Sequence, residues 1–132
     1  MNIVVATEEL LNEFLKSSHS EHFRYFNTRP TSIIKNHKLT LIGLVNNIPI
    51  AYGHIDYETY NWLGICVLDG YQGKGYGKKM MNELIGYADV AGLELYLSVD
   101  IDNINAINLY SKYNFIEYKR TDKIIYMKRL IA

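Results

Sequence analysis

The feature that most constrains this chain is a glycine-rich segment, residues 69–77 (DGYQGKGYG), which contains four of the nine glycines. A β-rich run at 61–68 precedes the segment, and an amphipathic helical pattern follows it. Apolar residues recur at helical spacing in that pattern: Met81, Leu84, Ile85 and Ala88. A strand that leads through glycines into a helix directs free backbone N–H groups and the positive end of the helix dipole at one point. The segment therefore predicts an anion-binding loop.

The spacing of these glycines excludes two common phosphate-binding loops. A Walker loop requires Lys after its second glycine, but Gly75 is followed by Tyr76. A dinucleotide-binding loop requires Gly-x-Gly-x-x-Gly, but Lys78 occupies the position of the third glycine. The pattern that remains is Gln72-x-x-Gly75-x-Gly77.

The order of elements predicts a single α+β domain over residues 1–132. Strands are expected at 2–5, 39–45, 49–57, 61–68, 93–99, 115–118 and 123–130, and helices at 8–17, from the glycine-rich segment to Gly92, and at 105–112. Thr7 is the expected N-cap of the first helix. Asn46-Asn47 predicts a tight hairpin, and Asn114 a left-handed helix end, because Asn tolerates positive φ. Consecutive hairpin strands followed by strand–helix–strand predict a mixed sheet, an antiparallel half joined to a parallel pair.

Composition narrows the classes of partner. Fourteen basic residues balance fourteen acidic ones, which argues against a nucleic-acid-binding surface built on bulk positive charge. Cys66 is the one cysteine, so a disulfide framework or a cysteine-rich zinc module is excluded and no metal site is predicted. The sequence has no apolar run of about 18 residues and no charged-then-apolar leader, so we expect a cytoplasmic protein that does not insert into a membrane.

Two segments carry a resemblance to a known family. The first is Gln72-x-x-Gly75-x-Gly77, directly after an apolar strand. The second is residues 105–115 (NAINLYSKYNF), in which Asn114 stands where glycine is usual and keeps the left-handed role. Together with the element order, these segments resemble the GNAT superfamily of N-acetyltransferases along nearly the whole chain. The first third matches in pattern only.

The resemblance implies that acetyl-CoA binds at the glycine-rich loop. Backbone N–H groups would surround the pyrophosphate, and the residues that contribute them are Gln72, Gly73, Lys74, Gly75, Tyr76, Gly77 and Lys78. The side chains of Lys74, Lys78 and Lys79 would add positive charge beside it.

The resemblance also implies that the parallel strands splay apart at their C-terminal ends. Pantetheine would then lie in the gap and pair with backbone groups of Ile65 and Val67, as an added strand would. The Val67 N–H would polarise the thioester carbonyl. Asn105 would bond to the pantetheine or to the helix start, and Tyr110 matches the family's general acid.

The general base is left open, because the strand at 61–68 contains no acidic residue. His54 and Asp56 lie two apart on one strand face, where Asp56 could orient His54 and raise its pKa. Tyr52 shares that face and could contact the substrate. A water-mediated route without a dedicated base is an equal alternative. Nucleophilic catalysis by a Cys–His pair is a further one, although Cys66 is expected to pack rather than attack.

The acceptor is expected to be a small amine. Phe23, Tyr25 and Phe26 could wall a pocket, and Arg24 or Arg29 could bind a carboxylate or phosphate, which favours an amino acid or an amino sugar. The transfer would be direct, within a ternary complex.

Other acceptors and roles are compatible with parts of the sequence. A polyamine would require several acids near the pocket, and the sequence offers only Asp56 and Glu58. The alternatives are a protein N-terminal or lysine acetyltransferase, a non-catalytic acyl-CoA-binding sensor and a nucleotide binder. The exposed edge of the strand pair at 115–130 predicts a homodimer.

Overall fold

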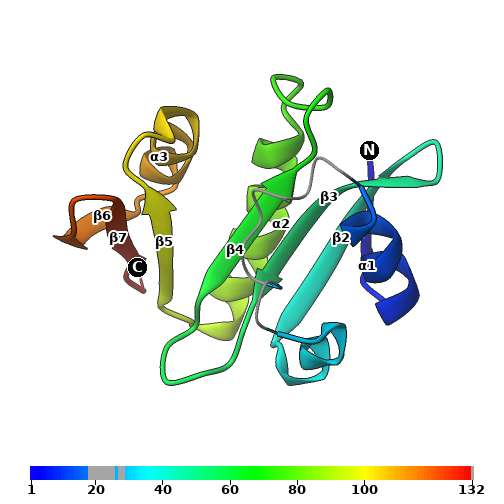
Figure 1. Ribbon diagram of the computed structural model, residues 1–132. Helices are drawn as coiled ribbons and strands as arrows, with labels where there is room; N and C mark the ends of the chain where they lie inside the picture. Colours follow the sequence, from blue (N-terminus) through cyan, green and yellow to red (C-terminus); the bar gives the residue numbers. More distant parts are fainter. Residues whose placement is uncertain (18–25, 27–28, 132) are drawn as a thin grey trace.

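The computed structural model describes residues 1–17, 26 and 29–131, and it divides their strands between two antiparallel sheets (Figure 1). The first sheet has the order β1-β2-β3-β4, and its strands are β1 (Asn2–Val5), β2 (Leu39–Val45), β3 (Ile48–Ile55) and β4 (Leu63–Val67). The second has the order β5-β7-β6, and its strands are β5 (Leu95–Asp100), β6 (Ile116–Arg120) and β7 (Ile124–Arg129). The predicted α+β architecture is confirmed.

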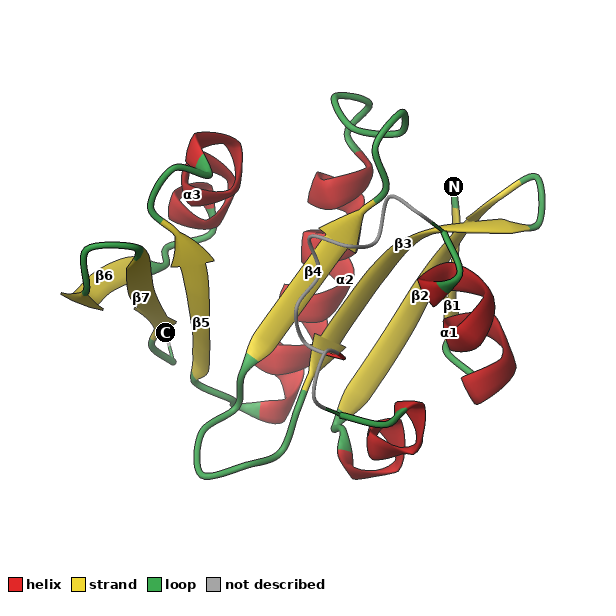
Figure 2. Ribbon diagram, viewed as in Figure 1, coloured by secondary structure: helices red, strands yellow, loops and turns green. Residues whose placement is uncertain are grey.

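Helices cover both faces of the first sheet, with α1 (Glu8–Leu15) on one face and α2 (Tyr76–Ala91) on the other (Figure 2). Alternate strand residues supply the two cores, because successive side chains of a strand point to opposite faces. Ile42 and Tyr52 pack with α1, whereas Leu41 and Ala51 belong to the core that contains α2. Gly53 permits the close approach of α2, since a β-carbon there would lie 2.9 Å from the Met80 side chain.

The point where the two sheets meet determines the site. β4 and β5 run parallel and share one isolated bridge, Trp62↔Tyr96, with the Tyr96 N–H donating to the Asn61 carbonyl at 2.9 Å. Beyond this bridge the strands diverge toward their C-terminal ends (Figure 1). The gap is therefore closed at the start of the two strands and open at their ends. The predicted antiparallel half and splayed parallel pair are both present, and because one bridge joins the parallel pair, the ladders form two antiparallel sheets.

The second sheet presents two different faces. Leu95, Leu97 and Val99 of β5 are buried in the core, and Tyr96, Ser98 and Asp100 alternate with them on the other face. Helix α3 (Ile104–Lys112) follows β5 directly. β6 is the outer strand, all of its residues are exposed, and it is irregular between Glu117 and Lys119. A homodimer through this edge stays a prediction.

Local turn and cap signals were read correctly from the sequence. The Thr7 hydroxyl accepts from the Leu10 N–H at 3.2 Å, and Asn46 and Asn47 have φ of 52° and 64°. Gly92 and Asn114 end their helices at φ of 68° and 70°.

Element bounds differ by a few residues from the predicted ones. The first helix ends at Leu15, β3 ends at Ile55, and a 3-10 helix, η3 (Thr31–Asn36), follows Pro30. Within residues 1–17, 26 and 29–131, no helix combines the length and the apolar character that a membrane crossing requires.

Candidate active site

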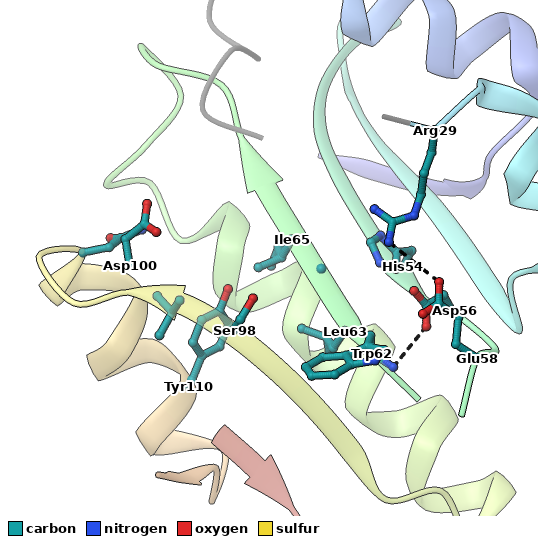
Figure 3. A pocket seen from close by; sticks show the side chains of 13 residues that line it. Arg29, His54, Asp56, Glu58, Trp62, Leu63, Ile65, Ser98, Asp100 and Tyr110 are labelled. Carbon is teal, nitrogen blue, oxygen red and sulfur yellow. Dashed lines mark hydrogen bonds and ion pairs between the residues drawn. The ribbon is translucent and has the colours of Figure 1, made fainter. Parts of the chain in front are cut away.

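A cavity of about 540 Å³ lies where β4 and β5 diverge (Figure 3). Residues from β3, β4, β5, α3 and the adjoining loops line it: Arg29, His54, Asp56, Glu58, Trp62, Leu63, Gly64, Ile65, Ser98, Val99, Asp100, Asn103 and Tyr110. The lining includes residues from both faces of the β4 strand. The cavity therefore extends through the gap between the two sheets.

The edge of β4 that borders this gap carries backbone groups directed away from β3. The Asp56 N–H donates to the Trp62 carbonyl and the Leu68 N–H to the Ile50 carbonyl, both at 2.9 Å. Backbone groups alternate in direction along a strand, so those of Ile65 and Val67 point into the gap. The backbone groups of Ile65 and Val67, which are the residues expected to pair with the cofactor, thus face the gap.

The glycine-rich loop lies between this strand and α2. Gly70, Gly73 and Gly75 have φ of +85°, +77° and +82°, a region that residues with a β-carbon rarely adopt. Gly75 is the N-cap of α2, and no side chain caps the first turn. In the described chain, nothing lies within 4 Å of a β-carbon built at these three glycines. The loop therefore leaves the first turn of α2 without a side-chain cap and has open space where side chains would stand at these glycines.

Gln72 has a structural contact that the sequence did not reveal. Its Nε2 donates to the Val67 carbonyl at 2.9 Å and to the Asp69 Oδ1 at 3.2 Å. The side chain thus ties the loop to the end of β4. Around the loop, Lys74, Lys78 and Lys79 are exposed, with the Nζ atoms of Lys74 and Lys79 5.8 and 5.9 Å from the ring centroids of Tyr71 and Tyr76.

Tyr110 reaches the cavity from α3. Tyr110 is 7% exposed, and its ring packs against the ring of Phe115 at a centroid distance of 6.0 Å. Figure 3 shows the hydroxyl ends of Tyr110 and Ser98 directed to the space between β4 and β5. Burial, and secondarily the nearby Cys66, raises the pKa of Tyr110 above its usual value near 10. The phenol therefore keeps its proton at neutral pH.

The predicted helix-start role of Asn105 is wrong, because Asn103 fills it. Asn103 is the N-cap of α3, and its Oδ1 accepts from the Ala106 N–H at 3.3 Å. Asn103 also lines the cavity, whereas Asn105 is exposed and does not. The alternative contact of Asn105 with pantetheine stays a prediction.

His54 lies on β3 and Asp56 directly follows the end of that strand, and both residues line the cavity. Both are buried, and the Asp56 Oδ1 accepts from the Trp62 N–H at 3.2 Å. The His54 ring stacks on His37 with centroids 4.8 Å apart. Burial, and then the positive charges of His37 and Arg29, lower the pKa of His54 well below 6.5. The expectation that Asp56 raises this pKa is wrong.

The residues expected to bind the acceptor are only partly placed. Phe23, Arg24 and Tyr25 lie outside the described residues. Tyr52 is fully buried next to Phe26, with ring centroids 5.7 Å apart, and does not line the cavity. Arg29 does line it.

The cavity contains more carboxylates than the sequence suggested. An Nη of Arg29 lies 3.8 Å from the Glu58 Oε1 (Figure 3). Asp100 joins Asp56 and Glu58 in the lining, and sequence reasoning missed both Asp100 and Ser98. The available signal was their alternation with the apolar Leu97 and Val99, on the strand next to the cofactor strand.

The environment of Cys66 disfavours a nucleophilic role. Burial, with a smaller contribution from Asp69, raises the pKa of its thiol to about 12, and its side chain packs with the core on the α1 side. A protonated thiol is a weak nucleophile. The described residues also contain no group of three or more His, Cys, Asp or Glu side chains arranged to bind a metal.

Comparisons with known proteins agree with this geometry. The model of the acetyltransferase (GNAT) family matches residues 4–115. Spermidine N(1)-acetyltransferase of Vibrio cholerae is 29% identical over 112 residues, which are 83% of this chain and 57% of that protein. Spermine/spermidine N(1)-acetyltransferase of Bacillus subtilis is 44% identical over 57 residues, which are 41% of this chain and 38% of that protein.

Solved structures share the fold. A GNAT family acetyltransferase from Brucella melitensis, crystallised in complex with acetyl-CoA, superimposes with a TM-score of 0.71 and 17% identity, over 99% of this chain and 88% of that one. The chain spans about half the length, or less, of the curated relatives it matches: the matched segments cover 57% of the first relative and 38% of the second.

Proposed function

The chain belongs to the acetyltransferase (GNAT) family. We propose that it transfers an acetyl group from acetyl-CoA directly to a primary amino group of a small molecule that carries several positive charges. One observation carries the proposal. A single cavity brings together the backbone edge of Ile65, the buried phenol of Tyr110 and the carboxylates of Asp56, Glu58 and Asp100. Such a cavity offers a strand edge and a proton donor to a thioester, and negative charge to an amine.

The loop and the strand edge have the chemistry that coenzyme A requires. Left-handed glycines and an uncapped helix N-terminus suit a diphosphate, and the flanking lysines add charge. The gap-facing groups of Ile65 and Val67 suit an extended amide-containing arm. When bound, acetyl-CoA would supply the acetyl group as an activated thioester. The Val67 N–H would then stabilise negative charge on the acyl oxygen.

Tyr110 is proposed as the general acid. Its hydroxyl is protonated across the neutral range and can donate a proton to a departing thiolate.

His54 and Asp56 are proposed to guide the proton that leaves the amine. The lowered pKa of His54 keeps its imidazole neutral above pH 6.5, so the ring can accept a hydrogen bond but holds a proton poorly. An alkylammonium has a pKa near 10, so we propose that its proton moves through water past these two side chains to solvent.

The charges of the cavity favour a cationic acceptor. Among the described residues that line it are three carboxylates and one arginine, Arg29, which lies beside Glu58. The expected acidic group on the acceptor depended on Arg24 and Arg29, and only Arg29 is described. Two curated relatives are named for spermidine and spermine, amines with several positive charges, which supports the same class.

A thiol-release assay tests the proposal. The protein is incubated with acetyl-CoA and a panel of amines: spermidine, 1,4-diaminobutane, butylamine, glutamate and glucosamine. We expect thiol release with the diamine and spermidine, and a mass increase of one acetyl group on the product. Binding of acetyl-CoA without thiol release from any amine would contradict the proposal and indicate a non-catalytic acyl-CoA-binding sensor.

A further inference from the structure

Three aromatic side chains form a cluster at the closed end of the gap, and the mechanism above does not use them. We call Tyr60, Trp62 and Tyr96 the aromatic triad. The ring centroids of Tyr60 and Tyr96 are 4.7 Å apart, those of Trp62 and Tyr96 6.1 Å, and those of Tyr60 and Trp62 6.4 Å. Trp62 lines the cavity, and Tyr60 is 51% exposed. The triad is thus an accessible aromatic wall that continues the cavity.

Carboxylates surround this wall. The Asp56 Oδ1 accepts from the backbone N–H of Trp62 at 3.2 Å, and the Glu94 Oε2 accepts from the Tyr96 hydroxyl at 3.4 Å. Glu58 lines the cavity two residues before Tyr60. Aromatic faces carry negative charge density, and carboxylates beside them strengthen the attraction for a cation. The chemistry of the wall is therefore complementary to an ammonium group.

The same sheet face already holds ammonium groups on tyrosine rings. The Nζ atoms of Lys128 and Lys119 each lie 5.5 Å from a ring centroid, over Tyr118 and Tyr126 respectively. Tyr118 in turn lies 6.0 Å from Tyr96. The chain's own lysines occupy the far part of the aromatic row, and the triad is the part that borders the cavity.

We propose that the aromatic triad, with Asp56 and Glu58, binds a second ammonium group of the acceptor, while the reacting amine lies between β4 and β5. This inference rests on the proposed function, because it takes the cavity as the acceptor site. It assigns Tyr60 and Trp62 a role in specificity: diamines and polyamines are selected over monoamines of equal length. A cation–π contact of this kind corresponds to about a five- to thirtyfold difference in Kd.

The fluorescence of Trp62 provides a direct test, since it is the one tryptophan of the chain. The protein without acetyl-CoA is titrated, at constant ionic strength, with diamines of three to eight carbons and with monoamines of the same lengths. We expect a saturable change in Trp62 emission with at least one diamine, and a Kd at least about five times weaker for its matched monoamine.

Variants separate the aromatic contact from general charge attraction. Tyr60→Leu should weaken the diamine Kd about tenfold, whereas Tyr60→Phe, which keeps the ring face, should retain it. Tyr118→Leu removes a ring of the same row outside the triad and should leave the Kd unchanged. Equal affinity for diamines and monoamines, or an unchanged Kd in Tyr60→Leu, would overturn the proposal.

The failure of this subsite and the failure of the proposed function give different results. If Trp62 responds to diamines as described but no amine is acetylated, the subsite stands and the transferase proposal fails. If diamines and monoamines are acetylated with equal kcat/KM and neither alters Trp62 emission, the transferase proposal stands and the subsite fails.

Discussion

The two sides of the gap between β4 and β5 have opposite chemistry. The side formed by the glycine-rich loop and the start of α2 presents backbone N–H groups, with exposed Lys74, Lys78 and Lys79 around them. The side formed by β3 and the outer face of β5 presents carboxylates and aromatic rings. An anionic cofactor and a cationic acceptor would therefore be drawn to different ends of one gap. Charge separation across the gap can therefore orient two substrates within a small domain.

The largest expected effect is on the proton donor between the two sides. Tyr110→Phe should lower kcat about a hundredfold or more, because it removes the hydroxyl that protonates the leaving thiolate. The Kd of acetyl-CoA, measured by calorimetry, should stay within about twofold, since the ring remains packed. Tyr87→Phe removes a hydroxyl from the half-exposed surface of α2 and is the matched control. A Tyr110→Phe enzyme with normal kcat would show that the donor is another group.

The loop side can be tested alone through Gly75. Its φ of +82° is strained for any residue with a β-carbon, so Gly75→Ala should weaken acetyl-CoA binding about tenfold. The Kd for a diamine should not change, because the acceptor side is untouched. Gly86→Ala, in the interior of α2 with no atom of the described chain near its β-carbon, should leave both affinities unchanged. Equal weakening of both ligands by Gly75→Ala would mean that the two sides are not independent.

The acceptor side can be tested alone through Asp100. Asp100→Asn should raise the KM for a diamine about three- to tenfold, because it removes one of the cavity's negative charges. The Kd of acetyl-CoA should not change. Asp102→Asn, an exposed carboxylate in the next turn that does not line the cavity, is the control. A larger effect of Asp102→Asn than of Asp100→Asn would place the acceptor outside this cavity.

The smallest expected effect is a pH dependence of stability on the acceptor side. Burial, with the positive charge of Arg29, lowers the pKa of His37 from 6.5 to about 4, and the pKa of His54 is lowered as well. The folded state then binds fewer protons than the unfolded state below pH 6.5, so the free energy of unfolding falls as the pH decreases from 6.5 toward 4. Tm measured across this range should decline less steeply in His37→Gln. An identical slope in the variant would assign the acid sensitivity to other groups.

The two sides also differ in how far the sequence predicted them. The loop is contiguous, and the need for glycine at Gly73 and Gly75 arises from the local backbone, so its position and role could be inferred from spacing. Asp100 and Ser98 enter the cavity only because β5 aligns with β4 at Trp62, and sequence periodicity does not specify that alignment.

The surroundings of the site residues were harder to predict from the sequence than their positions in the fold. His54 and Asp56 were placed correctly on one face, but the pKa direction of His54 was wrong. Its causes are burial, His37 and Arg29, and the last two are distant in sequence. Asn103 and Asn105 lie within one helical turn, and only the backbone geometry of the helix start shows which one caps it.

We propose that the loop amides and the gap-facing edge of β4 bind acetyl-CoA, and backbone amide NMR tests this proposal most directly. In the ¹⁵N-labelled protein titrated with acetyl-CoA, we predict saturable shifts of the amide signals of Ile65, Val67, Gly75 and Gly77. The signals of β6, on the far side of the second sheet, should stay unchanged. Saturable binding that shifts other amides and leaves those of Val67 and Gly75 in place would contradict the account.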